Sequence, residues 1–305
     1  MKPSLQDRGI SRKDLLQKAR NVKNDEFYTR YEDIEKEIAR YDKTIWHRKT
    51  VFCNCDDGAD ENRSSAFARY FLGNFKTLGL KKLICTHYSR GRDLFMPGEK
   101  PYIFTKEDSP DQPEKKIFPQ NYTGSFEDPL SLKILREEAD IVCTNPPFSK
   151  AKEFWKILLE SGKQFLIISN ILNVKNDAYI PYFTAGKVRA GYNEADWYET
   201  PEKGLTRAAG YWFTNFPVKN RPKYKNLKIL PLEAIPEKYK RFDDAGILLT
   251  DRNYIPGDYE KPFAVSVYPI VSGLLEKGFR ILQEKQYRPY IQGREVFARL
   301  LIQKV

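Results

Sequence analysis

The segment Ala139–Ser149 reads A-D-I-V-C-T-N-P-P-F-S. Its first part, Ile141–Thr144, is a short apolar and β-branched run that predicts a buried strand. The dipeptide Pro146-Pro147 ends that strand, because proline donates no hydrogen bond to a sheet, and it also restricts the backbone of Asn145. We therefore expect a stiff loop at the carboxyl end of a strand, which presents an amide side chain, backbone carbonyl groups and the ring of Phe148.

These groups suit chemistry at the exocyclic amine of a nucleobase, which is a poor nucleophile because its lone pair is delocalised into the ring. The side-chain oxygen of Asn145 and the carbonyl of Pro146 can accept both amine protons and favour a tetrahedral, nucleophilic nitrogen. Phe148 can stack on the base, which must leave a duplex to be reached. The alternative is an ordinary strand-ending turn, since Asn and Pro are turn residues, and a four-residue motif needs further context.

The composition indicates a folded, basic protein. The chain has 305 residues, of which 41% are hydrophobic and 14% aromatic, enough for one large domain or for a core domain with an added lobe. Lys and Arg number 52 against 41 Asp and Glu, a net charge of +11. This excess favours a polyanionic partner, with nucleic acid first and an anionic membrane second.

Several classes of protein are disfavoured. No run approaches the roughly 18 apolar residues of a membrane span, and Met1–Arg20 lacks the apolar core of a signal peptide. The four cysteines lie in strand-like runs, and Cys53-x-Cys55 with His47 and His87 fits no zinc module. We expect free thiols, no metal and a reducing, cytoplasmic location.

A nucleotide-binding unit is predicted near residue 50. Thr50–Cys55 predicts a buried strand, the acidic turn Asp56–Asp60 follows, and a helix is expected over Ser64–Leu78. The turn lacks G-x-G-x-x-G, and its acidic side chains would repel a pyrophosphate. They suit a cationic ligand such as S-adenosylmethionine, which carries a sulfonium and an ammonium group.

Strands and helices alternate over the first half of the chain, which predicts a mostly parallel sheet with helices on both faces. Ligands bind such sheets at the carboxyl ends of strands, where Asp56 and Asn145 both lie. The other expected elements are helices over Tyr31–Tyr41, Leu130–Glu138 and Lys150–Glu160, strands over Lys82–Tyr88 and Gln164–Ser169, and a loop over Ser89–Gln120 with a hairpin at Tyr102–Phe104.

The character of the chain changes after Asn170. Strands are expected over Lys187–Gly191, Tyr211–Phe216, Arg280–Leu282 and Val296–Ile302. Between the second and third lies a basic loop with interleaved Tyr and Pro, which is typical either of a nucleic-acid contact or of a solvated surface loop. Its cationic residues are Lys219, Arg221, Lys223 and Lys225. We place a domain boundary near Phe216.

The cluster Asn24–Arg30 also has two interpretations. Phe27 and Tyr28 can pack the start of the following helix onto the core, or they can cover a bound cofactor. The local sequence favours packing.

Taken in order, these segments resemble the adenine-specific DNA methyltransferases of the EcoRI modification-enzyme family. The resemblance covers nearly the whole chain, and the ordered set is more specific than N-P-P-F alone. The segments that carry it are Asn24–Arg30, Val51–Gly58, Gly124–Phe126, Ala139–Ser149, Phe165–Asn170, Trp212–Arg221 and Ile291–Ile302.

The resemblance implies that S-adenosylmethionine donates a methyl group to N6 of a flipped adenine and leaves as S-adenosylhomocysteine. It implies catalytic roles for Asn145, Pro146, Pro147 and Phe148, with Asn145 also beside the cofactor. It further implies three groups of cofactor-binding residues. Phe27, Tyr28 and Thr29 would contact the methionine end of the cofactor, and Gly124, Ser125 and Phe126 its adenine ring. Asn54, Asp56, Asp57 and Gly58 would form the cofactor-binding loop. The packing interpretation of the N-terminal aromatic residues is thereby replaced.

The implied fold is a Rossmann-like S-adenosylmethionine-dependent methyltransferase sheet. Residues 1–216 would form the catalytic domain, and residues 217–305 a basic target-recognition region that contacts double-stranded DNA. A restriction endonuclease acting separately is an expected partner, in a prokaryotic or phage-encoded system. The sequence departs from the family pattern at Ser125, where Asp is usual, and at Gly58, where Pro is common. Unlike many methyltransferases, it also has no acidic residue closely after the second strand, where one would hold the ribose hydroxyls.

Other functions are compatible with the same loop. Methylation of cytosine N4, or of adenine in RNA, uses similar chemistry, although Asn at the start of the motif favours adenine. A glutamine methyltransferase acting on protein shares the N-P-P-aromatic loop but needs no basic lobe. A non-enzymatic DNA-binding protein with a relict cofactor fold is disfavoured by Asn145–Phe148 and Asp56.

Overall fold

The computed structural model describes residues 28–56, 65–88, 100–109, 114–200, 204–219 and 227–305. The chain forms two compact units, each of which is discontinuous in sequence. Unit 1 contains Met1–Ser169 and Asn193–Trp212, and unit 2 contains Asn170–Tyr192 and Phe213–Val305. The second unit therefore includes a segment that precedes the predicted boundary near Phe216.

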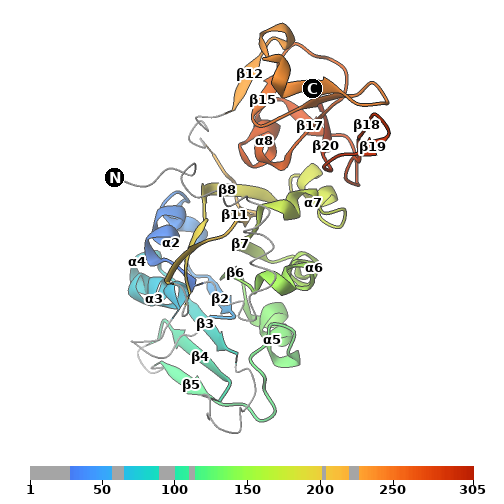
Figure 1. Cartoon of the computed structure of the whole chain (residues 1–305). Helices are drawn as coiled ribbons and strands as arrows, with labels where there is room; N and C mark the ends of the chain where they lie inside the picture. The colour runs from blue at the N-terminus through green and yellow to red at the C-terminus, as the bar shows by residue number, and fades with distance from the viewer. Residues whose placement is uncertain (1–27, 57–64, 89–99, 110–113, 201–203, 220–226) are drawn as a thin grey trace. The chain divides into compact units, whose positions relative to one another are not determined.

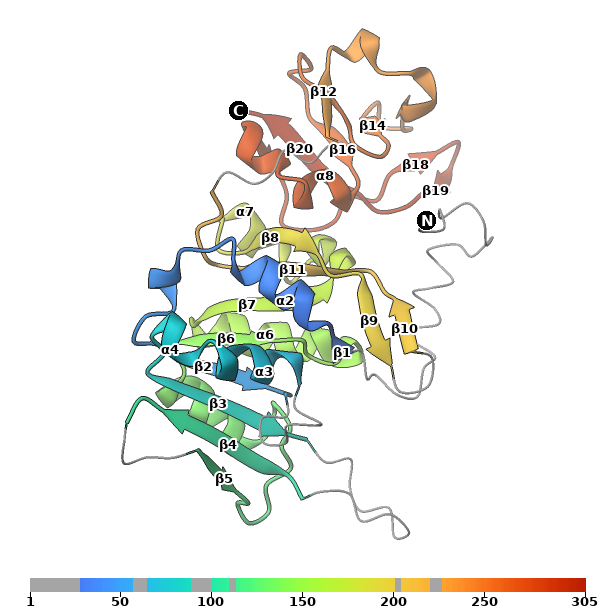
Figure 2. The same ribbon diagram turned by 90° about the vertical axis from the view of Figure 1, so that its left-hand side faces the viewer.

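The largest sheet contains eight strands in the order β5-β4-β3-β2-β6-β7-β11-β8. Its central strands β3, β2, β6 and β7 are parallel, and the hairpin β4-β5 is antiparallel to them. Figure 2 shows the strands of unit 1 side by side from β5 to β7. The bounds are β2 Thr50–Asn54, β3 Lys82–His87, β4 Tyr102–Glu107, β5 Lys115–Ile117, β6 Ile141–Thr144, β7 Gln164–Asn170, β8 Arg189–Glu194 and β11 Gly210–Thr214.

This arrangement confirms the prediction of an α/β protein with a large sheet, which is mixed because the predicted hairpin adds two antiparallel strands. β2 and β6 are buried along their whole length, as their continuous apolar runs require. All four cysteines are free, and only Cys55 is partly accessible. Burial raises the pKa of the Cys53 and Cys143 thiols well above the usual value, so both stay protonated and unreactive.

Helices cover both faces of the sheet of unit 1 (Figure 1). On one side lie α2 (Tyr31–Ile38), α3 (Ala66–Gly73) and α4 (Phe75–Leu78), and on the other α5 (Pro129–Lys133), the π-helical turn η3 (Ile134–Glu138) and α6 (Ala151–Ser161). The single helix predicted over Ser64–Leu78 is wrong, because Asn74 leaves helical geometry and its side chain donates to the carbonyl of Tyr70 at 3.0 Å.

A buried carboxylate joins α2 to a distant part of unit 1. Glu37 is fully buried and accepts hydrogen bonds from the backbone and side-chain amides of Asn193, at 2.9 and 2.7 Å. The hydroxyl of Tyr41 donates to the same carboxylate at 2.8 Å. A buried charge is tolerated when its oxygen atoms are hydrogen-bonded in this way.

A small antiparallel sheet brings three further strands together, β1 (Tyr28–Thr29), β9 (Trp197–Thr200) and β10 (Gly204–Arg207). Thr29 pairs with Tyr198, and Thr206 pairs with Tyr198 from the other side. Neither β9 nor β10 is predicted by the local sequence. Their pairing links the start of the described chain to a segment about 170 residues later, in a contact that no local pattern signals.

Unit 2 has a five-stranded sheet in the order β13-β14-β16-β20-β17 and two small two-stranded sheets, β12-β15 and β18-β19. Its core includes Leu248, Phe263, Val265, Leu300 and Ile302, all fully buried. Two strands of this unit were predicted, over Arg280–Leu282 and Val296–Ile302. Both are present as β17 and β20, although β20 begins later than predicted. The bounds are β12 Lys228–Leu230, β13 Lys240–Phe242, β14 Leu248–Thr250, β15 Tyr254–Pro256, β16 Phe263–Val265, β17 Phe279–Ile281, β18 Tyr290–Ile291, β19 Arg294–Glu295 and β20 Leu300–Lys304, with helices α7 Ile180–Thr184 and α8 Val267–Val271.

Short 3-10 turns complete the described structure. They are η2 Lys43–Ile45, η4 Phe148–Lys150, η5 Ile171–Lys175, η6 Leu232–Ala234, η7 Glu237–Tyr239 and η8 Leu274–Lys277.

Across the residues whose positions are described, no helix has both the length and the apolar character that crossing a bilayer requires.

Glu37→Ala is expected to lower the free energy of unfolding by roughly 3 kcal/mol, because it leaves the buried donors of Asn193 and Tyr41 without an acceptor. Urea unfolding followed by circular dichroism measures the change. Glu35→Ala, on the exposed face of the same helix, is the matched control and should change stability by less than about 0.5 kcal/mol. Equal effects in the two variants would contradict the role given to Glu37.

Candidate functional site

A threonine hydroxyl connects the carboxyl ends of β2 and β6. Thr144 Oγ1 lies 2.5 Å from the backbone oxygen of Asn54 and 2.5 Å from Oδ2 of Asp56. The hydroxyl has one proton and donates it to one of these acceptors at a time. Asp56 is only 6% exposed, so this contact holds a carboxylate in a largely water-excluded position at the edge of the sheet.

The backbone turns sharply between Asn54 and Asp56. Cys55 has a φ of 79°, a left-handed conformation that is uncommon for a residue with a side chain. Its N–H donates to Thr86 Oγ1, at the end of β3, over 3.1 Å. The ends of β2 and β3 are thereby joined where the predicted cofactor loop begins. Asp57 and Gly58, which were predicted to continue that loop, lie outside the described residues.

Gly124 brings the third predicted segment to the same edge. It has a φ of 77°, and a Cβ added there would lie 1.8 Å from the backbone oxygen of His87, the last residue of β3. Only glycine permits this approach. Burial raises the pKa of the Cys55 thiol, and a hydrogen bond from the backbone of Phe126 partly offsets this rise. Because the two groups are hydrogen-bonded, Phe126 lies beside the turn that follows β2.

The side chains of this segment have structural contacts. Phe126 is buried, and its ring packs edge-to-face on Phe154 of α6 at 5.2 Å. Ser125 Oγ accepts from the N–H of Glu127 at 3.2 Å, in the turn before α5. Asp128 then caps the helix by accepting from the N–H of Leu130 at 2.9 Å. Ser125, where the family usually has Asp, thus helps to form the turn that leads into α5.

The N-P-P-F segment forms a corner between β6 and α6. β6 ends at Thr144, Phe148 begins the turn η4, and α6 follows directly. The side-chain oxygen of Asn145 is shielded from solvent, Pro146 is buried, and Pro147 and Phe148 are half-buried. The carbonyl of Pro147 accepts from the N–H of Lys150 at 3.1 Å, which closes the turn. The strand, corner and helix predicted from this segment are therefore all present.

Tyr198 connects this corner with the N-terminal segment. Its ring meets Phe148 edge-to-face, with 5.7 Å between the centroids and 89° between the planes. It is fully buried, its hydroxyl donates to the backbone oxygen of Ala195, and burial raises its pKa well above the usual value. Because Thr29 pairs with Tyr198 in the small sheet, residues 28–29 and the N-P-P-F corner share one neighbour. Sequence reasoning missed Tyr198, whose only signal is its place in a short strand-like run.

The predicted site residues therefore separate into groups. Thr29, Asn54, Asp56, Gly124–Phe126 and Asn145–Phe148 belong to unit 1 and are linked through the contacts above. Tyr28 is 48% exposed at the start of β1. Lys219 is an exposed residue of unit 2, whose backbone exchanges hydrogen bonds with the hydroxyl of Tyr192. Phe27, Asp57, Gly58, Arg221, Lys223 and Lys225 lie outside the described residues.

Two buried oxygen atoms of unit 1 are suited to a ligand. Asn54 Oδ1 and Thr29 Oγ1 are inaccessible and have no hydrogen-bond partner within the described part of the chain. Buried polar atoms in folded proteins nearly always have a partner. A bound molecule with amino or hydroxyl groups would supply the missing donors, and the carboxylate of Asp56 favours one that carries a positive charge.

Comparison with known proteins agrees with this geometry. The sequence model of the family described as adenine-specific methyltransferase EcoRI matches residues 15–277. The chain belongs to this family. The predicted resemblance is thus confirmed over most of the sequence.

Three curated relatives are type II methyltransferases. The chain is 39% identical to M.EcoRI of Escherichia coli over 52% of its own length and 49% of that protein, and 38% identical to M.MpnI of Mycoplasma pneumoniae over 50% of its length and 43% of that protein. It is 35% identical to M.MgeORF184P of Mycoplasma genitalium over 57% of its length and 50% of that protein. The chain spans about half the length of the curated relatives it matches. No solved structure matches it.

Gly124→Ala is expected to destabilise unit 1 by more than about 2 kcal/mol, because the new methyl group collides with the His87 carbonyl and the residue must keep a positive φ. Gly73→Ala is the matched control, since a Cβ there meets nothing within 4 Å and Ala favours the helix. Urea unfolding should show a large loss for the first and a small gain for the second. Similar midpoints would argue against the close approach.

Proposed function

We propose that this chain is an S-adenosylmethionine-dependent DNA methyltransferase that modifies N6 of an adenine flipped out of duplex DNA. The observation that carries the proposal is the N-P-P-F corner at the end of β6, joined through Thr144 to the buried carboxylate of Asp56, in a chain that belongs to an adenine-specific methyltransferase family. On this proposal the sheet of unit 1 is a Rossmann-like methyltransferase sheet.

The cofactor would be held by residues with complementary chemistry. Asp56 attracts a cation, while Asn54 and Thr29 offer acceptors to ammonium or hydroxyl groups. Gly124–Phe126 would lie along the adenine ring, and Asp57, Gly58, Phe27 and Tyr28 are assigned to the cofactor by family resemblance. When bound, S-adenosylmethionine supplies a methyl group made electrophilic by its sulfonium centre. No metal is required.

The role of Asn145 and Pro146 is to make the amine nucleophilic. Their oxygen atoms would accept the two N6 protons and draw the nitrogen lone pair out of conjugation with the ring. Fixing the amine in line with the methyl group adds the advantage of proximity. A general base is unnecessary, because the methylated amine is strongly acidic and releases its proton to solvent.

Phe148 would stack on the extruded adenine. An aromatic face suits this task because a flipped base loses its stacking partners and needs new ones. The ring of Phe148 is supported edge-to-face by Tyr198, which is itself fixed by its hydroxyl. A rigid stacking partner reduces the entropy lost when the base enters.

The remaining assignments follow from this function. Residues 1–216 would act as the catalytic domain, and residues 217–305, including Lys219, Arg221, Lys223 and Lys225, as the DNA-contacting region. Double-stranded DNA is the proposed partner, with a restriction endonuclease acting separately on the same sequence. The proposed location is the bacterial cytoplasm, for a chromosomal or phage-encoded enzyme.

Transfer of labelled methyl groups to duplex DNA, single-stranded DNA and RNA tests the proposal. Nucleoside mass spectrometry should identify N6-methyladenine in duplex DNA. N4-methylcytosine, or label in RNA alone, would identify one of the alternative functions instead. Absence of label from every nucleic acid, in protein that binds the cofactor, would reject the proposal.

Asn145→Ala is expected to lower kcat by about 10²- to 10³-fold, the loss typical of removing one hydrogen-bonding group that acts in a transition state. Binding of S-adenosylmethionine, measured by calorimetry, should change little, and Glu160→Ala, at an exposed position of α6, should retain normal turnover. Wild-type turnover in the Asn145 variant would remove the proposed role of its amide.

Asp56→Asn should weaken S-adenosylmethionine binding by about 10- to 100-fold, because a charge-assisted hydrogen bond contributes roughly 1.5–3 kcal/mol. Calorimetry with S-adenosylhomocysteine distinguishes a contact of Asp56 with the ammonium group from a contact with the sulfonium group, since the product keeps the ammonium group but lacks the sulfonium charge. Asp108→Asn, at an exposed carboxylate of the same unit, is the matched control. Unchanged affinity for both ligands in the Asp56 variant would contradict its role.

A further inference from the structure

Unit 2 contains a compact group of aromatic and cationic side chains to which the proposed function gives no individual role. Tyr239 and Tyr254 stack with 4.5 Å between their ring centroids and 14° between their planes. Three cations surround the pair: Lys228 over Tyr254 at 4.8 Å, and Lys238 and Arg252 over Tyr239 at 5.0 and 5.4 Å. We call these five residues the tyrosine–cation patch.

The patch is assembled from three separate segments. Lys228 begins β12, which pairs in parallel with β15, so that Lys228 lies opposite Tyr254. Lys238 and Tyr239 belong to the turn η7, and the backbone oxygen of Tyr239 accepts from the N–H of Asp251 at 2.9 Å. That bond fixes the chain next to Arg252. Three segments that converge in this way define a built surface rather than a charged run on one element.

Arg252 has an unusual backbone. Its φ of 58° lies in the left-handed region, where glycine is normally favoured and a long side chain is strained. The turn between β14 and β15 nevertheless has an arginine there, with the guanidinium group directed to the tyrosine pair.

Within the described part of the chain, none of the three cations forms an ion pair with a carboxylate. Acidic side chains near them in sequence are engaged elsewhere: Glu237 pairs with Lys240 at 2.9 Å, and Asp251 pairs with Arg299 at 2.9 Å. Asp258 accepts from the N–H of Leu232 at 2.8 Å. Lys228, Lys238 and Arg252 are all exposed, so their charges are available to an external anion.

The geometry also limits how a nucleic acid can bind. The two tyrosine rings stack on one another, so each gives one face to its partner, and the three exposed cations beside the pair are the groups that can reach an external anion. Contact through the cations is therefore directed to the sugar-phosphate backbone. A lysine that lies over a ring and donates to its hydroxyl, as Lys228 does to Tyr254 at 3.1 Å, is held in place while its remaining protons stay available.

We infer that the tyrosine–cation patch binds the phosphate backbone of duplex DNA and positions the DNA without reading its sequence. This inference rests on the proposed function, because it names a contact surface for the same substrate. A surface of this type contributes affinity that depends strongly on salt and little on sequence.

The test measures duplex DNA binding by fluorescence anisotropy over a range of salt concentrations. Each of Lys228→Ala, Lys238→Ala and Arg252→Ala is expected to reduce the slope of log affinity against log salt by about 1, and the triple variant by about 3, for specific and unrelated duplexes alike. Lys238→Arg should retain the wild-type slope, because it retains the charge.

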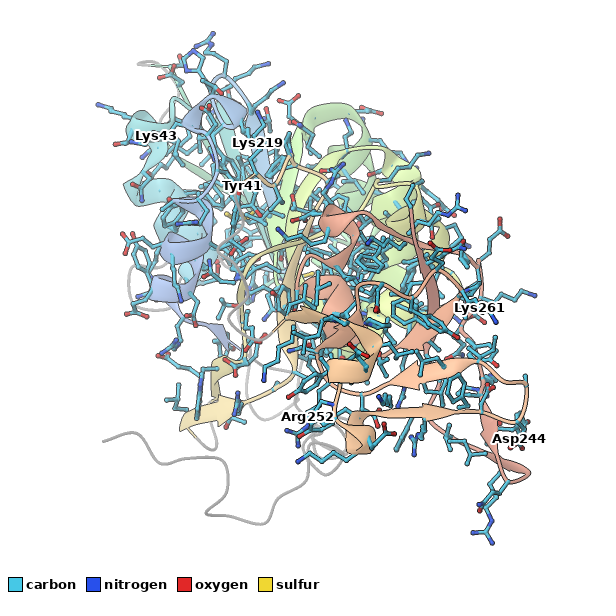
Figure 3. All side chains as sticks on the ribbon, turned by 90° about the horizontal axis from the view of Figure 1, so that it is seen from above. Tyr41, Lys43, Lys219, Asp244, Arg252 and Lys261 are labelled. Carbon is cyan, nitrogen blue, oxygen red and sulfur yellow. The ribbon has the colours of Figure 1, made fainter. Side chains whose placement is uncertain are left out.

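Lys261→Ala is the matched control. Lys261 is an exposed cation of unit 2 that projects from a different edge than Arg252, as Figure 3 shows. Its removal should leave the slope unchanged. Equal reductions for Lys261 and for the patch residues would overturn the inference, since net charge alone would then explain them. An unchanged slope in the triple variant would overturn it as well.

Methyl transfer by the same proteins separates this inference from the proposed function. If the patch binds backbone, the triple variant should raise KM for DNA and leave kcat at saturating DNA near the wild-type value. DNA binding that depends on the patch in a protein without methyl transfer would support the patch and reject the function. Methyl transfer with wild-type KM in the triple variant would support the function and reject the patch.

Discussion

The shared hydroxyl of Thr144 is the contact around which the carboxyl edge of the sheet is organised. Through it, the end of β6 meets both the last carbonyl of β2 and the carboxylate of Asp56. The N–H of Cys55 makes the equivalent link to β3. Parallel strands bring their ends together in any α/β sheet, but these bonds set which residues face one another. An acidic group and the N-P-P-F corner, far apart in sequence, thereby become neighbours.

The sequence predicted the parts of the fold that depend on local physics. Ile141–Thr144 is a strand because it is apolar and β-branched, and the two prolines end it where they must. The helix expected over Ser64–Leu78 shows the limit of this reasoning, because periodicity continues through Asn74 while its side chain competes for the backbone. β9 and β10 were missed for a different reason, since their stability comes from pairing with each other and with β1.

The candidate site was predictable to a similar extent. The residues to which the proposed chemistry is assigned, Asn145, Phe148 and Asp56, stand in recognisable motifs. The residues that support them do not stand in such motifs. Tyr198 contacts Phe148 only through tertiary packing. Gly210 leaves room for Tyr198, because a Cβ at residue 210 would lie 1.7 Å from the Tyr198 hydroxyl. Ser125 looked like a lost acidic group, and its observed task is to hold the turn before α5. Supporting contacts of this kind follow from shape rather than from residue type.

The charges of the protein pose a physical problem that burial resolves. A chain with a net charge of +11 attracts polyanions and repels a cationic cofactor at long range. At short range the balance reverses around Asp56, because a carboxylate in a water-excluded position interacts strongly with a neighbouring cation, whereas distant exposed charges are screened by salt within about 10 Å. In the role inferred for the tyrosine–cation patch, its exposed cations would act in the opposite way, because they would gain affinity by releasing the ions condensed on DNA. If the proposed function holds, rising salt should therefore weaken DNA binding much more than cofactor binding, so that a basic protein could bind a cationic donor and a polyanionic acceptor at once.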